Sequence, residues 1–232
     1  MTDGPDHGGD LGERLALVAY AVDDAVRTAG RRPDEVTTIV VTKLHPASLV
    51  RELHALGVRD VAENRHQEAQ AKSAETSDLE GLRWHFVGQL QSKKARQARR
   101  YASAVHSIDR DSVVDALAVD DGDVVDGFVQ VSLDGREGRG GVPEPDVERL
   151  VERLLAAPGV RLRGVMAVAP LGEPARPAFA RLLRVSERVR SLAPEADAIS
   201  AGMSDDFADA VAEGATHLRI GTAITGSRPE AG

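Results

Sequence analysis

The chain has 232 residues, enough for one barrel-sized domain or two small ones. Of these, 42% are hydrophobic and only 3% aromatic, so we expect Val, Leu, Ile and Ala to fill the core, as in the interior layers of a barrel. Its 37 acidic and 29 basic side chains give a net charge of −8, which disfavours broad binding to nucleic acid or anionic membranes. The chain contains no cysteine, which excludes disulfides, thiolate nucleophiles and cysteine-ligated metals.

The first ten residues are acidic and rich in glycine, and they contain no apolar stretch. We therefore expect a disordered tail over residues 1–10, rather than a signal peptide, followed by one domain over residues 11–232. No window approaches the roughly 18 apolar residues that a membrane span needs. A soluble, cytoplasmic protein is the resulting expectation.

From residue 11 onward, helical and strand patterns alternate along the chain. Residues 11–29 carry apolar side chains at helical spacing, and residues 36–42 are β-branched almost throughout, which indicates a buried strand. Further strands are predicted at residues 58–62, 82–87, 104–108, 124–133, 160–168, 196–199 and 216–220. The intervening helices are predicted at residues 46–56, 64–74, 93–101, 111–119, 143–157, 177–192 and 205–213.

Eight strands separated by helices, without a hairpin signal, are typical of an α/β fold that closes into a single (β/α)8 TIM-type barrel. The helix before the first strand is an addition to that pattern. A doubly wound open sheet is the alternative. In a barrel the working groups lie in the loops that follow the strands, so these loops are the place to look for a site.

Lys43 ends the first predicted strand. A lysine at the mouth of an apolar strand is desolvated, which lowers the pKa of its amine and frees it for imine chemistry. The alternative is a lysine whose ammonium simply reaches solvent.

Two polar residues follow the second and seventh strands. Asn64 either hydrogen-bonds a ligand in the mouth of the barrel or caps the next helix, with Gln67 completing a capping box. Ser204 follows Gly202 at a helix entry, where free N–H groups favour an anion, although a plain N-cap explains it equally well.

The eighth strand ends in Gly221 and Thr222, which allow close backbone approach and offer a hydroxyl and an N–H group. The loops after strands seven and eight are the habitual phosphate site of such barrels, so we expect a phosphate site there.

Two other features point away from further sites. The basic run at residues 93–100 favours a solvated helix face, with an adaptor for RNA or protein as the alternative. The seven histidines show no HExxH spacing, and we expect no metal site.

Several short runs together resemble the pyridoxal phosphate (PLP, vitamin B6) homeostasis protein family, which is related in fold to the N-terminal barrel of alanine racemase and to the fold type III PLP barrels. The runs are Val41-Thr-Lys43, Glu63-Asn64, Trp84-His-Phe-Val-Gly88, Leu90-Gln91, Gly164-Val-Met166-Ala, Gly202-Met-Ser204-Asp-Asp and Arg219-Ile-Gly-Thr222-Ala. They extend over nearly the whole chain. Lys93 and Thr225 depart from the family, which usually has Asn and commonly Phe there.

The resemblance implies that Lys43 carries PLP as a Schiff base, and that Ser204, Gly221 and Thr222 hold its phosphate. It also places Arg219 beside the pyridine nitrogen and Asn64 near the ring, with Ser200 and Met166 as further walls of the pocket.

An always-charged guanidinium at the pyridine nitrogen keeps that nitrogen unprotonated, which makes the ring a poor electron sink. The only tyrosines, Tyr20 and Tyr101, lie outside the predicted βα loops. We therefore expect a PLP carrier or buffer, monomeric and without catalytic residues, whose partners include apo forms of PLP-dependent enzymes. A fold type III amino-acid racemase or decarboxylase is the alternative.

Overall fold

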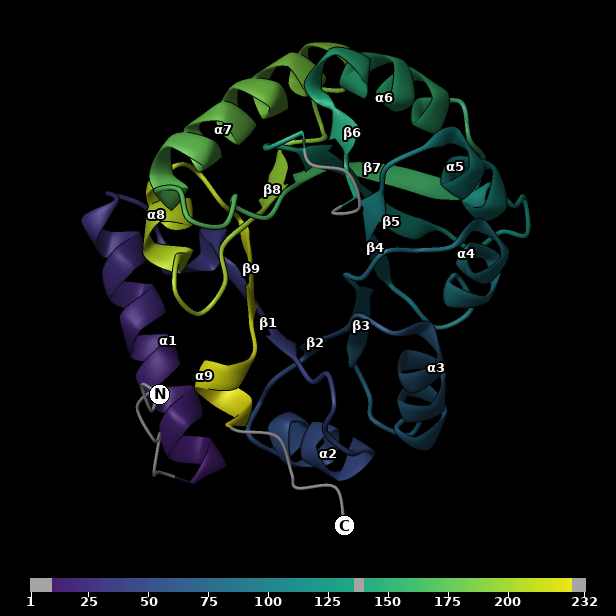
Figure 1. Ribbon diagram of the computed structural model, residues 1–232. Coiled ribbons are helices and arrows are strands. Elements are labelled where there is room, and N and C mark those ends of the chain that lie inside the picture. Colours follow the sequence, from purple (N-terminus) through teal and green to yellow (C-terminus); the bar gives the residue numbers. More distant parts are fainter. Residues whose placement is uncertain (1–9, 136–139, 227–232) are drawn as a thin grey trace.

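Eight parallel strands close into a barrel in the computed structural model, which describes residues 10–135 and 140–226 (Figure 1). Around the barrel the order is β1, β2, β3, β4, β5, β7, β8 and β9, and β9 returns to β1. Hydrogen bonding between β4 and β5 completes the circle, so the prediction of a closed barrel is confirmed and the open-sheet alternative is wrong. The strands are β1 (Thr37–Val41), β2 (Asp60–Glu63), β3 (Arg83–Phe86), β4 (Ala104–Ile108), β5 (Val125–Ser132), β7 (Val160–Met166), β8 (Ala198–Ser200) and β9 (His217–Ile220).

Helices form the outer ring of the barrel (Figure 1). They are α1 (Leu11–Thr28), α2 (Ala47–Ala55), α3 (His66–Glu75), α4 (Ser92–Ala98), α5 (Asp111–Leu117), α6 (Val147–Leu155), α7 (Ala175–Leu192), α8 (Phe207–Ala212) and α9 (Thr222–Thr225), with 3-10 turns at Pro33–Glu35 and Glu144–Asp146. The additional helix α1 packs outside the ring against α8 and α9, and Arg14 Nε donates a 2.8 Å hydrogen bond to the Ile224 carbonyl.

The expected elements are all present, and two short ones were not expected. The two-residue strand β6 (Val142–Pro143) pairs with β5, and α9 has four residues; both are too short to produce a periodic pattern. Residues 1–9 of the expected tail lie outside the described residues. Asp10 does not belong to a tail, because it caps α1 in a reciprocal capping box with Glu13.

The aliphatic core lies between the strands and the helices rather than inside the barrel. Along the strands, Val105, Val129, Val165 and Ile199 join this outer core, whereas their neighbours Ala104, Phe128, Met166 and Ala198 form a separate cluster. Side chains alternate across a strand, so the second set faces the barrel interior. Histidines share that space: His106 stacks on Phe128 with ring centroids 4.2 Å apart. The expectation of an interior filled by Val, Leu, Ile and Ala is therefore wrong for the barrel interior, which is partly aromatic and polar.

Gly164 allows β7 and β8 to approach closely. Its φ is +149°, and a Cβ atom there would overlap the carbonyl oxygen of Ala198. One strand of a closed barrel cannot shift without its neighbours, so the overlap caused by a side chain at this position cannot be relieved by moving β7 away from β8.

We therefore expect Gly164→Ala to lower the free energy of unfolding by more than about 3 kcal/mol, because overlap with backbone adds to the roughly 1–2 kcal/mol cost of an unfavourable φ. Gly30→Ala is the matched control: Gly30 also has a positive φ, +69°, but no atom lies within 4 Å of its added Cβ. Urea unfolding of both variants measures the difference. Equal losses would show that the β7–β8 approach does not require glycine.

Candidate functional site

The predicted site residues come from five neighbouring strands of the barrel. In the order β2, β1, β9, β8 and β7, these strands lie side by side, and the predicted residues occupy their carboxyl-terminal ends or the loops that follow. The set is Asn64, Lys43, Arg219, Gly221, Thr222, Ser200, Ser204 and Met166. Residues more than 170 positions apart in the sequence thus share one arc of one rim, which is where barrels of this type carry their chemistry.

Lys43 lies in a tight turn directly after β1. The backbone N–H of His45 donates to the Thr42 carbonyl at 3.1 Å, and Leu44 has a φ of +67°, the only positive value of a described residue other than glycine. Glu68 holds this strained residue by accepting from the Leu44 N–H at 3.2 Å. Strained backbone of this kind accompanies functional sites. Lys43 itself is exposed, so the expected desolvation is not found.

A buried ion pair supports this turn from below, and sequence reasoning missed it. Lys72 Nζ contacts Glu63 Oε1 and donates to the Thr42 carbonyl at 2.9 Å, while Thr42 Oγ1 donates to Glu63 Oε1 at 2.9 Å. Glu63 Oε2 is buried and has no partner among the described residues. Burial raises the pKa of Glu63 against the opposing effect of Lys72. Lys72 sits on a helix without any apolar pattern around it, so the sequence held no signal for its burial.

Asn64 is exposed on the rim and does not cap a helix. Helix α3 begins at His66, and its N-cap residue, Arg65, makes no side-chain capping bond, so the capping-box alternative with Gln67 is wrong. Gly88 packs directly against the backbone of Asn64, since a Cβ at Gly88 would overlap the Asn64 carbonyl group.

Ser204 lies in the turn between β8 and α8 and is half-buried. It is not the N-cap of α8, since that position belongs to Asp206, whose carboxylate accepts from the Met203 N–H at 2.6 Å. Gly202 has a φ of +92°, and an added Cβ would lie 2.8 Å from the Cβ of Ala210, so the turn requires glycine.

The loops after β8 and β9 carry backbone donors without protein acceptors. Among the residues that the structure describes, the N–H groups of Ser204, Thr222 and Ala223 make no hydrogen bond to the protein. Thr222 and Ala223 open α9, which the N-cap residue Gly221 introduces. Free N–H groups at such turns suit an anion.

Arg219, Ser200 and Met166 lie inside the barrel, buried under this rim. Arg219 donates from one terminal nitrogen to Ser200 Oγ at 2.7 Å and from the other to the Ala167 carbonyl at 2.9 Å. No carboxylate within the described ranges forms an ion pair with it. Burial lowers the pKa of Arg219 to about 10, so the guanidinium remains charged at neutral pH.

The basic run at residues 93–100 is only partly a solvated face. Lys93 and Arg96 are exposed on α4, but Arg99 is half-buried and donates to the carbonyls of Gly159, Val119 and Asp123 and to the carboxylate of Asp121. Arg99 therefore ties loops together, which reduces the charge available to a partner.

No group of three or more His, Asp or Glu side chains suited to a metal ion occurs in the described part of the chain. Nor does any helix in these residues combine the length and apolarity needed to cross a bilayer.

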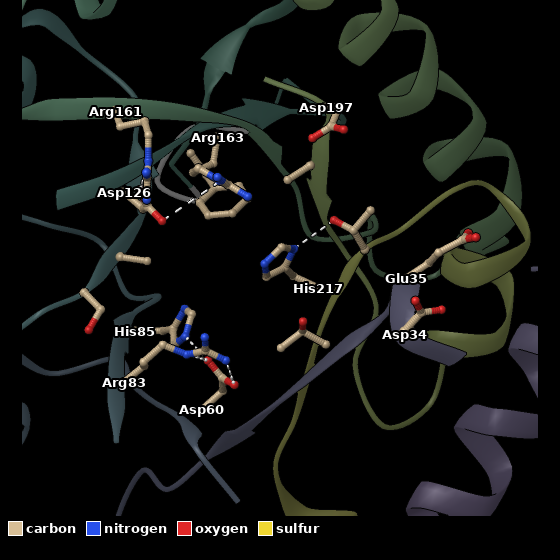
Figure 2. Close-up of a pocket in the computed structure, with 16 residues that line it drawn as sticks. Asp34, Glu35, Asp60, Arg83, His85, Asp126, Arg161, Arg163, Asp197 and His217 are labelled. Atoms are coloured by element: carbon tan, nitrogen blue, oxygen red, sulfur yellow. Dashed lines mark hydrogen bonds and ion pairs between the residues drawn. The ribbon is translucent and has the colours of Figure 1, made fainter. Parts of the chain in front are cut away.

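A cavity of about 450 Å³ lies at the opposite, amino-terminal end of the barrel (Figure 2). Its charged groups are largely paired with one another: Arg83 with Asp60 at 2.5 Å, and Arg161 with Asp126 at 2.7 Å. The amino-terminal face of such barrels serves stability rather than chemistry. We therefore assign the candidate site to the carboxyl-terminal rim and not to this cavity.

Comparisons with known proteins agree with this assignment of fold. The family model described as alanine racemase, N-terminal domain, matches residues 21–229. The pyridoxal phosphate homeostasis protein of Pseudomonas aeruginosa is 40% identical over 224 residues, which cover 94% of this chain and 96% of that protein. The protein of the same name from Mycobacterium tuberculosis (strain H37Rv) is 38% identical over 245 residues, with 97% and 95% covered.

Among solved structures, PipY of Synechococcus elongatus PCC7942 is similar both with PLP bound and without it. The form with PLP bound has a TM-score of 0.81 and 36% identity, and the match covers 93% of this chain and 99% of PipY. The form without PLP has a TM-score of 0.82. The fold, the length and the sequence all agree: the chain belongs to the pyridoxal phosphate homeostasis protein family, built on the barrel of the alanine racemase N-terminal domain.

Proposed function

We propose that this protein binds PLP covalently through Lys43 at the carboxyl-terminal rim of its barrel and serves as a PLP carrier or buffer without turnover of a substrate. Residues 11–232 act as the cofactor-binding domain in this proposal. When bound, PLP supplies an aldehyde that condenses with an amine and a ring that can withdraw electrons.

The observation that carries the proposal is Arg219. A buried guanidinium with no carboxylate partner in the described structure calls for acceptors, and two of its five N–H groups are already used by Ser200 and Ala167. A pyridine nitrogen is an uncharged acceptor of the right kind. Because Arg219 stays charged, it does not donate a full proton to that nitrogen.

The rest of the rim suits the remaining parts of PLP. The amine of Lys43 is accessible for attack on an aldehyde, and the free N–H groups of Ser204, Thr222 and Ala223 suit a phosphate. Met166 and Ser200 line the interior below, and Asn64 lies on the rim two strands from Arg219. PipY, with PLP bound in the same fold, supports the assignment of the cofactor.

The absence of turnover is proposed on the chemistry of the rim. Tyr20 is exposed on α1, and the Tyr101 hydroxyl is hydrogen-bonded to His66 at 3.1 Å; neither residue follows a strand of the barrel. One observation favours the alternative, a racemase-like enzyme: His45 lies on the rim two residues from Lys43, and burial lowers its pKa, so it is a neutral base at pH 7.

We further propose that the protein acts in the cytoplasm as a monomer, with apo forms of PLP-dependent enzymes as recipients of the cofactor. Its net charge of −8 supports a protein that stays free of nucleic acid and membrane surfaces. Light scattering of the purified protein and transfer of PLP to an apo-enzyme test these statements directly.

Lys43→Ala is expected to abolish the adduct that borohydride traps between protein and PLP, because no other described amine stands at this rim in a comparable turn. Lys93→Ala, which changes an exposed lysine on α4, is the control and should keep the adduct. Mass spectrometry of the reduced protein locates the modified residue. An adduct on Lys72, Lys93 or Lys94 would show that the site is assigned wrongly.

We propose that the Ser204 hydroxyl also donates to the phosphate. Ser204→Ala removes this hydroxyl and keeps the backbone N–H, and it is expected to weaken PLP binding about tenfold to a hundredfold, because a hydrogen bond to a charged group contributes about 1.5–3 kcal/mol and 1.4 kcal/mol is a factor of ten. Pyridoxal, which lacks the phosphate, should bind poorly to the wild type and be indifferent to the substitution. Titration followed by absorbance measures both ligands. If pyridoxal and PLP lose affinity equally, Ser204 serves the turn and the phosphate lies elsewhere.

The PLP-loaded protein is expected to racemise neither enantiomer of alanine or serine faster than free PLP does, since an unprotonated ring nitrogen stabilises a carbanion poorly. Exchange of the α-proton in deuterated water measures this. Exchange well above the free-PLP rate that disappears in His45→Ala would establish the enzyme alternative instead.

A further inference from the structure

A chain of hydrogen bonds crosses the barrel interior from the candidate site to the opposite end. It joins five buried side chains from five different strands, in the order Arg219, Ser200, His106, His85 and Asp60. The four links measure 2.7, 2.8, 2.9 and 2.9 Å. Figure 2 shows the far end, where His85 and Arg83 both reach Asp60 beside the amino-terminal cavity.

The two ends of this chain determine the direction of every hydrogen bond in it. Arg219 has only donors, so Ser200 Oγ accepts from it and directs its own proton to His106 Nδ1. A neutral His106 then carries its proton on Nε2 and donates to His85 Nδ1. His85 in turn donates from Nε2 to the Asp60 carboxylate, which has only acceptors. The opposite tautomer of His106 would leave the Ser200 hydroxyl proton without an acceptor among the described residues.

The charges along the chain agree with this direction. Burial lowers the pKa of His106 well below its usual range, and the nearby Arg219 cation acts in the same sense. Burial alone would raise the pKa of Asp60, but the hydrogen bonds from His85 and Arg83 outweigh it and lower that pKa to about 2. A cation therefore stands at one end and an anion at the other, with neutral dipoles aligned between them.

This alignment stabilises Arg219, which has no carboxylate contact of its own in the described structure. It also fixes the guanidinium plane, because Ser200 and the Ala167 carbonyl engage its two terminal nitrogens separately. Phe128 stacks on His106 and prevents the ring from turning out of the chain. Apolar side chains could fill the interior equally well, but they would neither stabilise the charge of Arg219 nor fix the plane of its guanidinium.

We propose that Ser200, His106 and His85 are positioning residues that hold Arg219 charged and in one orientation toward the ring nitrogen of PLP. The inference rests on the proposed function, in which Arg219 faces that nitrogen. Its central claim, the direction of the hydrogen bonds, concerns the protein alone and is testable without PLP.

The first experiment is NMR of the cofactor-free protein labelled with ¹⁵N-histidine. Long-range ¹H–¹⁵N correlations should show His106 and His85 as Nε2–H tautomers, and His106 should remain neutral well below the ordinary histidine pKa of about 6.5. His106→Asn assigns the signals. A His106 in the Nδ1–H tautomer, or one that titrates near pH 6.5, overturns the proposal whether or not Lys43 binds PLP.

The second experiment compares matched variants loaded with PLP that carries ¹⁵N in its ring. His106→Leu removes the acceptor for Ser200 and is expected to shift the ring-nitrogen signal and to weaken binding about tenfold, the value of roughly one hydrogen bond. His106→Asn should restore both, because its amide oxygen can accept from Ser200. His217→Leu is the control. The ring centroids of His217 and His106 lie 6.4 Å apart, but His217 is hydrogen-bonded to Thr216 and is not part of the hydrogen-bond chain.

Ser200→Ala breaks the same chain without adding bulk, and it should shift the ring-nitrogen signal in the same direction as His106→Leu. Circular dichroism checks that each variant folds. Equal effects of His106→Leu and His217→Leu, or an unshifted signal in Ser200→Ala, would show that the chain serves packing only. Failure of Lys43→Ala to abolish the borohydride adduct would instead refute the proposed function and leave the NMR result on the cofactor-free protein standing.

Discussion

A closed barrel of parallel strands imposes one constraint on which everything else here depends: all eight strands end at the same rim. Loops that are distant in the sequence, such as those holding Lys43 and Thr222, become neighbours because β1 pairs with β9. Closure also removes free sheet edges, so a strand cannot shift to relieve a poor contact. The strained turn at Leu44 persists on this rim because Glu68 and the buried pair of Glu63 and Lys72 hold it from below.

The same closure separates two kinds of interior. Aliphatic side chains fill the layer between strands and helices, where burial of apolar area is the main source of stability. Inside the barrel, alternate residues of the same strands bring together His85, His106, Ser200 and Arg219. Buried polar groups are stable when they are hydrogen-bonded, and each of these four side chains makes at least one hydrogen bond. The barrel interior thus contains a hydrogen-bonded set of polar side chains, and this set ends at Arg219 below the carboxyl-terminal rim.

A cofactor carrier and a cofactor-dependent enzyme place different demands on one barrel. An enzyme needs an electron-withdrawing cofactor ring and a correctly positioned acid–base group, whereas a carrier needs to bind the cofactor tightly but reversibly. In the proposed site, a charged Arg219 facing the ring nitrogen would meet the second demand and work against the first. The exposure of Lys43 agrees with the carrier proposal, because an imine formed there would be accessible for exchange with another amine.

Local signals in the sequence were sufficient for the fold and for placing Lys43, Asn64 and Ser204 in loops that follow strands. A β-branched run predicted β1, the alternation of strand and helix patterns predicted the other seven strands, and Gly202 predicted a turn, because strand propensity and positive φ are properties of short segments. The starts of α3 and α8 were predicted two residues early, because Asn64 and Ser204 are good N-cap residues in isolation, whereas in the structure they lie in the preceding loops.

Only the tertiary structure decided which polar residues meet. His106 and Ser200 are 94 residues apart in the chain, and Lys72 finds Glu63 through the packing of α3 on β2. Such pairs are made by closure of the barrel, and no local propensity encodes them.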